Sequence, residues 1–121
     1  MLARRAWPAY AGPMNLLRER EKNRLLRRET DAAAARRKLR DALGAIPGLD
    51  RVVIFGSLAR RGAFHSRSDI DVAIEKEPPG MTRYQLAARL EEAMGRPVDV
   101  VLLGETRLRD KILCEGETWT L

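Results

Sequence analysis

The chain has 121 residues, of which 45% are hydrophobic, 33% charged and 5% aromatic. This length supports one globular domain and excludes a two-lobed enzyme, and the composition excludes a disordered or fibrous protein. The net charge is +6, and the whole excess lies in residues 1–50, which hold twelve Lys or Arg against six Asp or Glu. An acidic partner or polyanion is therefore expected to meet the N-terminal half.

The single cysteine, Cys114, excludes an internal disulfide, and one Cys with one His cannot make a structural zinc site. The basic start is interrupted by Pro8, Gly12 and Pro13, so no signal peptide is expected. No run approaches the roughly 18 apolar residues of a membrane helix, and we therefore expect a cytoplasmic protein without membrane contact.

The N-terminal half predicts a tail followed by one long basic helix. Residues 1–14 lack periodicity and read as a flexible tail. Residues 15–43 contain neither Gly nor Pro and are rich in helix formers, with Asn15 as a possible cap, so a helical region over 15–47 is expected. A narrow apolar stripe at three and four spacing indicates that only the second half packs closely. Its members are Leu25, Ala32, Ala35, Leu39, Ala42 and Ile46.

Residues 48–121 alternate between strand and helix patterns, which predicts an α/β or α+β domain built on a small sheet. The helix at 82–94 has Thr82 as its cap and ends at Gly95. The short helix at 106–114 is expected to turn Leu108, Ile112 and Leu113 inward and to bury Cys114 as a structural thiol. The other expected elements are strands at 51–55, 69–75 and 98–103, a short helix at 58–61, and a strand or tail at 118–121.

Asp69 and Asp71 are separated by one residue on a predicted strand, so their side chains point to the same face. Two adjacent carboxylates repel each other and raise one pKa unless a cation lies between them. Magnesium fits this demand, because it takes hard oxygen ligands and often binds one or two carboxylates together with substrate phosphates. Taken alone, an exposed polar strand face is the commoner explanation of such a pair.

Two further features belong to the other predicted strands, 51–55 and 98–103. Gly56 and Ser57 follow a buried strand and precede a short helix, where backbone amides and a hydroxyl can bind an anion. The alternative is an ordinary turn. Asp99 interrupts the apolar run 98–103, and burying its carboxylate is expensive without a partner. It either joins the other two acids or faces solvent.

The combination of these features resembles the minimal nucleotidyltransferases, the MNT domains of the DNA polymerase β superfamily. The resemblance covers about residues 49–121 and rests on the segments 55–60, 66–74 and 97–101 and on the ending 112–116. It implies a polymerase β-type fold, with a small mixed sheet flanked by helices and an extra long N-terminal helix. Residues 1–14, 15–47 and 48–121 would then be a tail, the basic helix and the nucleotidyltransferase domain.

The resemblance also implies the chemistry, which is transfer of a nucleotide from a nucleoside triphosphate to an acceptor. The expected reaction moves AMP from ATP, and another triphosphate with its own nucleotide is the alternative. Two Mg²⁺ ions would be held by the catalytic residues Asp69, Asp71 and Asp99, of which Asp99 also helps to deprotonate the attacking hydroxyl. The residues implied to bind the nucleotide are Gly56, Ser57, Arg60 and Ser68.

One departure from the family concerns the loop between these residues. Eleven residues separate Ser57 from Asp69, where the family commonly has ten, and Arg61 is the extra one. A longer loop costs little free energy, but it would alter catalysis if it moved the phosphate-binding turn relative to the metals. His65, in the same loop, is expected to be exposed, with a phosphate contact as the alternative.

Small members of this family are often encoded beside a HEPT-domain protein as the antitoxin of a toxin-antitoxin pair, and some of them silence that toxin by attaching AMP to a tyrosine. The resemblance therefore implies a HEPT-type partner with an acceptor hydroxyl. A second hypothesis is a non-catalytic module that binds its partner through residues 15–43. A third is nucleic-acid contact through Arg24, Arg27, Arg28 and residues 36–38, which the interleaved acids of the helix disfavour. A small domain with exposed apolar residues is also a candidate for self-association.

Overall fold

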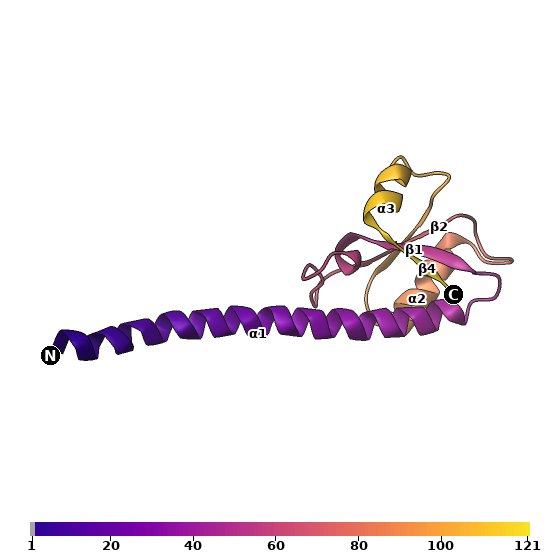
Figure 1. Cartoon of the computed structure of the whole chain (residues 1–121). Helices are drawn as coiled ribbons and strands as arrows, with labels where there is room; N and C mark the ends of the chain where they lie inside the picture. Colours follow the sequence, from indigo (N-terminus) through magenta and orange to yellow (C-terminus); the bar gives the residue numbers. More distant parts are fainter. Residues whose placement is uncertain (1) are drawn as a thin grey trace.

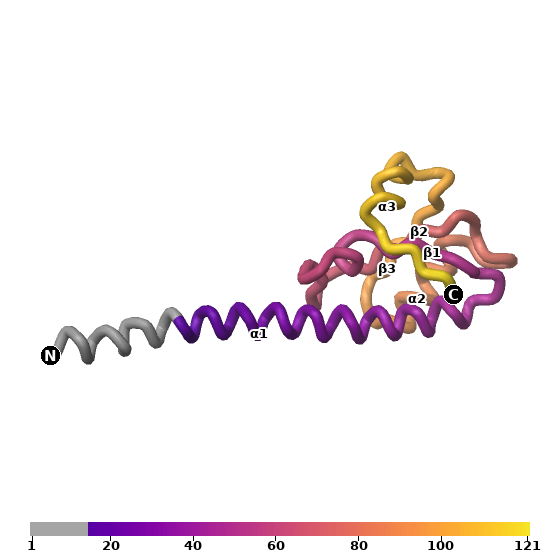
Figure 2. Tube along the Cα trace, in the orientation of Figure 1, coloured from indigo at the N-terminus to yellow at the C-terminus, as the bar shows by residue number. Residues whose placement is uncertain are grey.

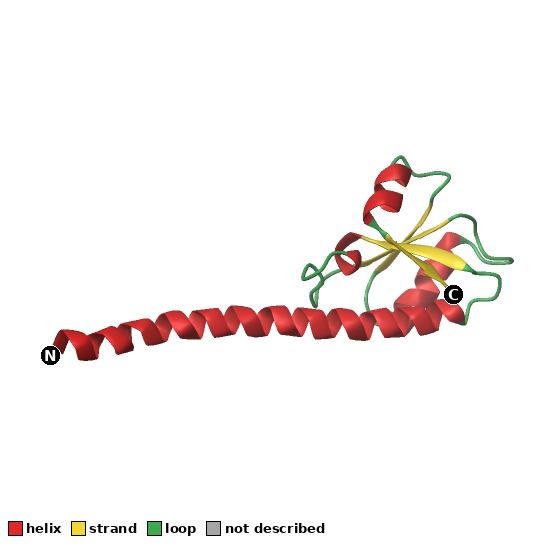
Figure 3. Cartoon of the chain, in the orientation of Figure 1, coloured by secondary structure: helices red, strands yellow, loops and turns green. Residues whose placement is uncertain are grey.

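The structure is a computed structural model. It describes the backbone of residues 2–121 and the side chains of residues 15–121. A long N-terminal helix is followed by a sheet with two further α-helices (Figures 1 and 3). The elements in chain order are α1 (Leu2–Gly44), β1 (Arg51–Phe55), the 3-10 helix η1 (Gly56–Ala59), β2 (Ile70–Ile74), α2 (Arg83–Met94), β3 (Val98–Leu102), α3 (Arg109–Glu115) and β4 (Glu117–Thr120).

The four strands form one mixed sheet in the order β3-β2-β1-β4. The β1 strand runs antiparallel to both β2 and β4, whereas β2 and β3 are parallel and are joined by α2. A parallel pair needs such a crossover connection, which explains why a helix stands between these two strands. The expected mixed sheet flanked by helices is confirmed.

The two faces of the sheet bury different amounts of apolar surface. Helices α1 and α2 cover one face, where a large core holds residues such as Leu39, Ile54 and Leu90. Helix α3 covers part of the other face over a smaller core that includes Val53 and Ile112. Figure 1 shows α1 and α3 on opposite sides of the sheet. The second face is thus only partly covered, and polar side chains can occupy the rest.

Only the second half of α1 packs on the sheet. Ala35, Leu39 and Leu43 are buried, whereas every side chain in 15–27 is exposed, and this part of the helix projects past the rest of the protein (Figure 2). Leu25, which the stripe assigned to the packed face, is 46% exposed because the sheet does not reach that far.

The N-terminal boundary of α1 also differs from the prediction. The helix runs without a break through Asn15, so Asn15 does not begin it. The flexible tail expected over 1–14 falls on residues whose side chains lie outside the described part, and it stays a prediction. The division between a helix at 15–47 and a domain at 48–121 also stays a prediction.

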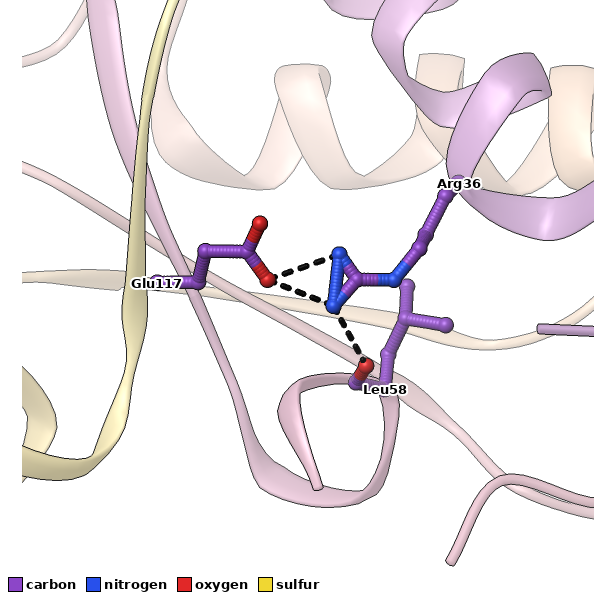
Figure 4. Close-up of polar contacts among 3 residues, drawn as sticks. All are labelled: Arg36, Leu58 and Glu117. Atoms are coloured by element: carbon purple, nitrogen blue, oxygen red, sulfur yellow. Dashed lines mark hydrogen bonds and ion pairs between the residues drawn. The ribbon is translucent and has the colours of Figure 1, made fainter. Parts of the chain in front are cut away.

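Arg36 fastens α1 to two other elements (Figure 4). Its guanidinium donates to the Glu117 carboxylate on β4, with one N···O distance of 2.7 Å, and to the Leu58 carbonyl of η1 at 3.3 Å. It also lies over the Trp119 ring, together with Arg40, whose guanidinium carbon is 4.5 Å from the ring centroid. Because η1 carries the Gly56-Ser57 turn, this link holds that turn against the helix.

The expectations for α3 were partly wrong. The helix begins at Arg109 instead of residue 106, and of its expected inward residues only Ile112 is buried. Leu108 and Leu113 are exposed, and so is Cys114. Adjacent helical positions are turned by about 100°, so Leu113 and Cys114 cannot face the sheet together with Ile112. Leu108 precedes the first turn of the helix.

In the described part of the chain, no helix has both the length and the apolar character that crossing a membrane requires.

Candidate active site

Asp71 and Asp99 are direct neighbours across the parallel pair β2–β3. On the other side of Asp71 lies Phe55, its partner across the antiparallel pair β1–β2. Residues paired in this way share one face of the sheet. The row Phe55–Asp71–Asp99 therefore crosses three strands on the face that α3 covers only in part.

Asp69 immediately precedes β2, two residues before Asp71, and the spacing directs it to the same face. The neighbouring Ile70 N–H donates to the Pro97 carbonyl at 3.0 Å, which holds the start of β2 beside the start of β3. Asp69 and Asp99 are exposed, and Asp71 is half-buried between them and β1. The acids therefore lie at the end of the sheet where β1 ends and where β2 and β3 begin.

Gly56 brings the turn after β1 against the Asp71 carboxylate. A Cβ on Gly56 would lie 2.2 Å from Asp71 Oδ2, and the glycine has a positive φ of 71°. Any other residue would meet both a clash and an unfavourable backbone conformation. The Gly56-Ser57 turn is therefore in direct contact with the acids, as an anion-binding turn beside a metal site requires.

The acids interact electrostatically as well as geometrically. The pKa of Asp71 is raised from 3.8 to about 6, mainly by burial and further by the negative charges of Asp99 and Asp69. Each of these causes disfavours a negative charge on Asp71. A cation between the acids would favour that charge and lower the pKa of Asp71.

The donor set fits Mg²⁺. Carboxylate oxygens are its preferred protein ligands, and the mutual repulsion of Asp69, Asp71 and Asp99 is relieved by a divalent cation. Among the residues described, no three His, Cys, Asp or Glu side chains already gather into a complete ligand group. Mg²⁺ commonly binds only one or two carboxylates and completes its shell with substrate phosphates and water. Two of the three acids are therefore enough to hold one Mg²⁺ ion.

A cavity of about 200 Å³ opens beside Phe55 and Gly56, the two residues of the β1 end that lie against Asp71; the three acids themselves are not part of its lining. Phe55, Leu108 and Ile112 give it an apolar lining, whereas Arg60 and Lys111 add two positive charges. Gly56 and Glu115 complete the lining. An apolar pocket with cations at its side, next to a carboxylate row, suits a planar base attached to phosphates.

The remaining residues expected to bind the nucleotide differ in their surroundings. Ser57 is half-buried in η1, and its carbonyl accepts from the Arg60 N–H at 3.2 Å. Arg60 is exposed at the cavity. Ser68 is buried, and its hydroxyl accepts a hydrogen bond from the His65 N–H at 3.0 Å. Ser68 thus holds the loop before Asp69, and its contact with nucleotide stays a prediction.

The extra residue of the loop is absorbed away from the acids. Arg61 points outward to Glu29 of α1, with an N···O distance of 3.4 Å. Phe64 is buried and lies under the Arg96 guanidinium, which donates to the carbonyls of His65 and Ser68 at 3.2 and 3.1 Å. His65 itself is exposed, as expected. The longer loop therefore leaves Gly56 in contact with Asp71.

The sequence profile described as "Polymerase beta, Nucleotidyltransferase" matches residues 37–119. The chain belongs to this nucleotidyltransferase family. The first 36 residues, most of α1, lie outside the match. A comparison with curated proteins gave no significant match.

Solved structures similar to this MNT-type nucleotidyltransferase include one described as a toxin-antitoxin with AMP-PNP. It is 30% identical, covers 70% of this chain and 73% of its own, and has a TM-score of 0.56. A second, described as the toxin-antitoxin MntA-HepT, is 26% identical, covers 77% and 73% of the two chains, and has a TM-score of 0.47. The first similarity supports a polymerase β-like α+β fold.

Sequence reasoning did not identify the contribution of α3 to the site. Leu108, Lys111, Ile112 and Glu115 all line the cavity. Their spacing of three, four and seven residues is that of one helix face, which is the signal that would have found them. The sequence alone did not show that this face lies over the end of β1.

Proposed function

We propose that this nucleotidyltransferase transfers AMP from ATP to a hydroxyl group of a partner protein with the help of Mg²⁺. The observation that carries the proposal is the placement of Asp71 beside Asp99, with Gly56 in contact with the Asp71 carboxylate. Carboxylates next to an anion-binding turn are what a triphosphate with its counter-ions needs.

Each part of the site has a role in positioning the triphosphate. The backbone amides of Gly56 and Ser57 bind the β- and γ-phosphates. Arg60 and Lys111, at the cavity, offset the negative charge of the phosphates. Asp69, Asp71 and Asp99 would hold Mg²⁺, which when bound supplies positive charge to the phosphates and to the acceptor oxygen. Catalysis then consists mainly of positioning and charge stabilisation.

The proposed step is an in-line displacement. The acceptor oxygen forms a bond to the α-phosphorus of ATP while the bond between that phosphorus and the bridging oxygen breaks. Pyrophosphate leaves with the bond electrons, and AMP remains on the acceptor. The exposed Asp99 carboxylate accepts the proton of the hydroxyl.

The acceptor that we propose is a HEPT-type protein encoded nearby, which makes this chain the antitoxin of an MNT/HEPT pair. The motif resemblance supports this partner. The similar structure described as a toxin-antitoxin with AMP-PNP supports both the antitoxin role and an adenine nucleotide.

Label transfer tests the proposal. The full chain is incubated with Mg²⁺, the HEPT-type protein and ATP labelled with ³²P at either the α- or the γ-phosphate. We expect the partner to retain α-label and no γ-label, because AMP transfer releases the other two phosphates as pyrophosphate. Asp69→Asn is expected to lose labelling at least 100-fold, and EDTA to abolish it.

The matched control is Asp41→Asn, which neutralises an exposed acid on α1 and should label like the wild type. A γ-labelled partner would indicate phosphoryl transfer and contradict the proposal. A partner that binds tightly but never gains label would instead support the non-catalytic binding module, an alternative that the projecting half of α1 favours.

A further inference from the structure

The face of α1 that packs on the sheet continues beyond the sheet. Positions 17, 24, 28, 35 and 39 follow each other at intervals of seven and four and lie on one side of the helix. Ala35 and Leu39 are buried in the core, whereas Leu17 and Arg24 are exposed. The same helix face is therefore core at one end and free surface at the other.

A basic cleft opens where this free face begins. It has a volume of about 400 Å³ and lies between α1 and the loop before β2. Its lining consists of Arg24, Arg27, Arg28, Asp31, His65 and Ser66. Arg28 donates to the Gly62 carbonyl at 3.3 Å. Arg24 and Arg27 form no ion pair with any of the described residues. Asp31 is the single acid in the lining, so the cleft has an excess of positive charge.

The cleft lies at the same end of the sheet as the acids, while α1 and the acids are on opposite faces of the sheet. The loop that lines it leads directly into Asp69, and α1 projects past this end of the sheet (Figure 1). A protein that binds the free face of α1 and reaches around this end of the sheet would meet Asp69 and Asp99. Residues 1–36 also lie outside the family match, so this surface is an addition to the nucleotidyltransferase domain.

We propose that the free face of α1 from Leu17 to Arg28, together with the cleft, is the docking surface for the protein that accepts the nucleotide. The partner presents acidic side chains to Arg24 and Arg27 and apolar ones to Leu17 and Leu25. The inference rests on the proposed function for the identity of the acceptor, and it adds the surface that brings the acceptor hydroxyl to the acids.

The composition of the projecting half favours a protein over a nucleic acid. Leu16, Leu17, Leu25 and Leu26 are all about half exposed or more, and exposed leucines contribute little to binding a phosphate backbone. The arginines alternate with Glu19, Glu21 and Glu29, which would repel phosphates. Arginine beside apolar side chains is instead typical of the centre of a protein interface.

Charge reversal at two pairs of basic residues on α1, one pair in the cleft and one outside it, tests the docking surface. The binding of the full chain to the HEPT-type protein is measured by calorimetry without nucleotide. Arg24→Glu with Arg27→Glu is expected to raise the Kd at least tenfold. Arg37→Glu with Lys38→Glu makes the same charge change on α1 outside the cleft and outside residues 17–28, and should alter the Kd less than twofold. All four residues are exposed, so circular dichroism should show folded variants.

Kinetics add a readout that a structural effect would not reproduce. In the label-transfer assay, the Arg24→Glu, Arg27→Glu variant should raise the KM for the partner at least tenfold and leave the KM for ATP unchanged. If the wild type binds the partner through this surface but never labels it, the docking surface stands and the proposed activity fails.

Three results would overturn the docking surface. The first is equal binding by both double variants, and the second is a wild-type chain that does not bind the HEPT-type protein. The third is that the cleft variant binds the partner as the wild type does but has lost another interaction of the wild type. That interaction is either binding to a 20-base-pair DNA duplex or the formation of a dimer of this chain. That result would assign the surface to nucleic acid or to self-association.

Discussion

Gly56 is the residue on which the geometry of the site depends most directly, and alanine there is expected to lower activity at least tenfold. The substitution forces a residue with a Cβ to a φ of 71°, which costs about 1–2 kcal/mol, and it pushes the Asp71 carboxylate away. Gly80→Ala is the matched control, because Gly80 has a φ of 72° and open space around it. Urea unfolding should show a loss in both variants, whereas α-label transfer should fall at least tenfold in Gly56→Ala alone. Equal activity of the two variants would contradict the role assigned to Gly56.

Asp71 is expected to make the stability of the protein depend on pH. Its pKa is raised to about 6 in the folded protein, so the folded state holds a proton that the unfolded state releases above pH 4. The stability that this proton confers is complete below pH 4 and is lost as the pH rises through 6. Two pKa units correspond to at most about 3 kcal/mol, and solvent access to the half-buried carboxyl reduces this to about 1 kcal/mol.

Asp71→Asn should therefore match the wild type in unfolding free energy near pH 4 and exceed it by about 1 kcal/mol at pH 7.5. The measurement is urea unfolding in EDTA at both pH values, with Asp41→Asn as a control on an exposed acid. A difference between Asp71→Asn and the wild type that stays constant with pH would show that burial and the neighbouring acids do not raise the pKa of Asp71.

Among the elements, those with local signals were predicted closely and those fixed by tertiary contacts were not. The predicted strand 51–55 has the bounds of β1, and α2 begins after the expected cap Thr82, which forms a capping box with Gln85, and ends at the expected Gly95 in a left-handed conformation. Both depend on residues adjacent in sequence. The order of the strands and the exposure of Cys114 depend on which element packs on which, and no local pattern contains that information.

The candidate site divides in the same way. Asp69 and Asp71 could be identified from period-two spacing, and Asp99 from its place inside an apolar strand run. The contribution of Lys111 could not, because it depends on where a short helix lies over the end of β1. The path of the long loop was also unpredictable, since it is set by contacts of Arg28 and Arg96 with loop carbonyls that are far away in sequence.

The loop before β2 is the element whose order should control access to the acids, and Arg96 is its anchor. Arg96→Met removes two hydrogen bonds to loop carbonyls and the stacking on Phe64. We expect a loss of about 1 kcal/mol in unfolding free energy and faster amide exchange across 62–69. Arg89→Met, on the exposed face of α2, is the control and should change neither. Unchanged exchange in Arg96→Met would show that the loop is held by other contacts.

At the scale of the whole molecule, α1 has two separate tasks. From Ala35 onward it is part of the core, and Arg36 ties it to η1 and β4. Before Arg28 it contributes no buried side chain among the described residues. A helix that extends well beyond its packing surface gains little stability from that extension. The extension is therefore better explained by binding than by folding.

A chain that begins at Asn23 should fold as well as the full chain. The described side chains that it removes are all exposed, and Asn23 is a favourable residue for the first position of a helix. We expect the unfolding free energy to stay within about 0.5 kcal/mol and the affinity for a fluorescent ATP analogue to be unchanged. A chain that begins at Arg37 keeps the family match but loses Ala35 and Arg36, and should be less stable by at least about 2 kcal/mol. A large loss already in the chain that begins at Asn23 would mean that the projecting half supports the fold, and its proposed role in docking would then lose its structural basis.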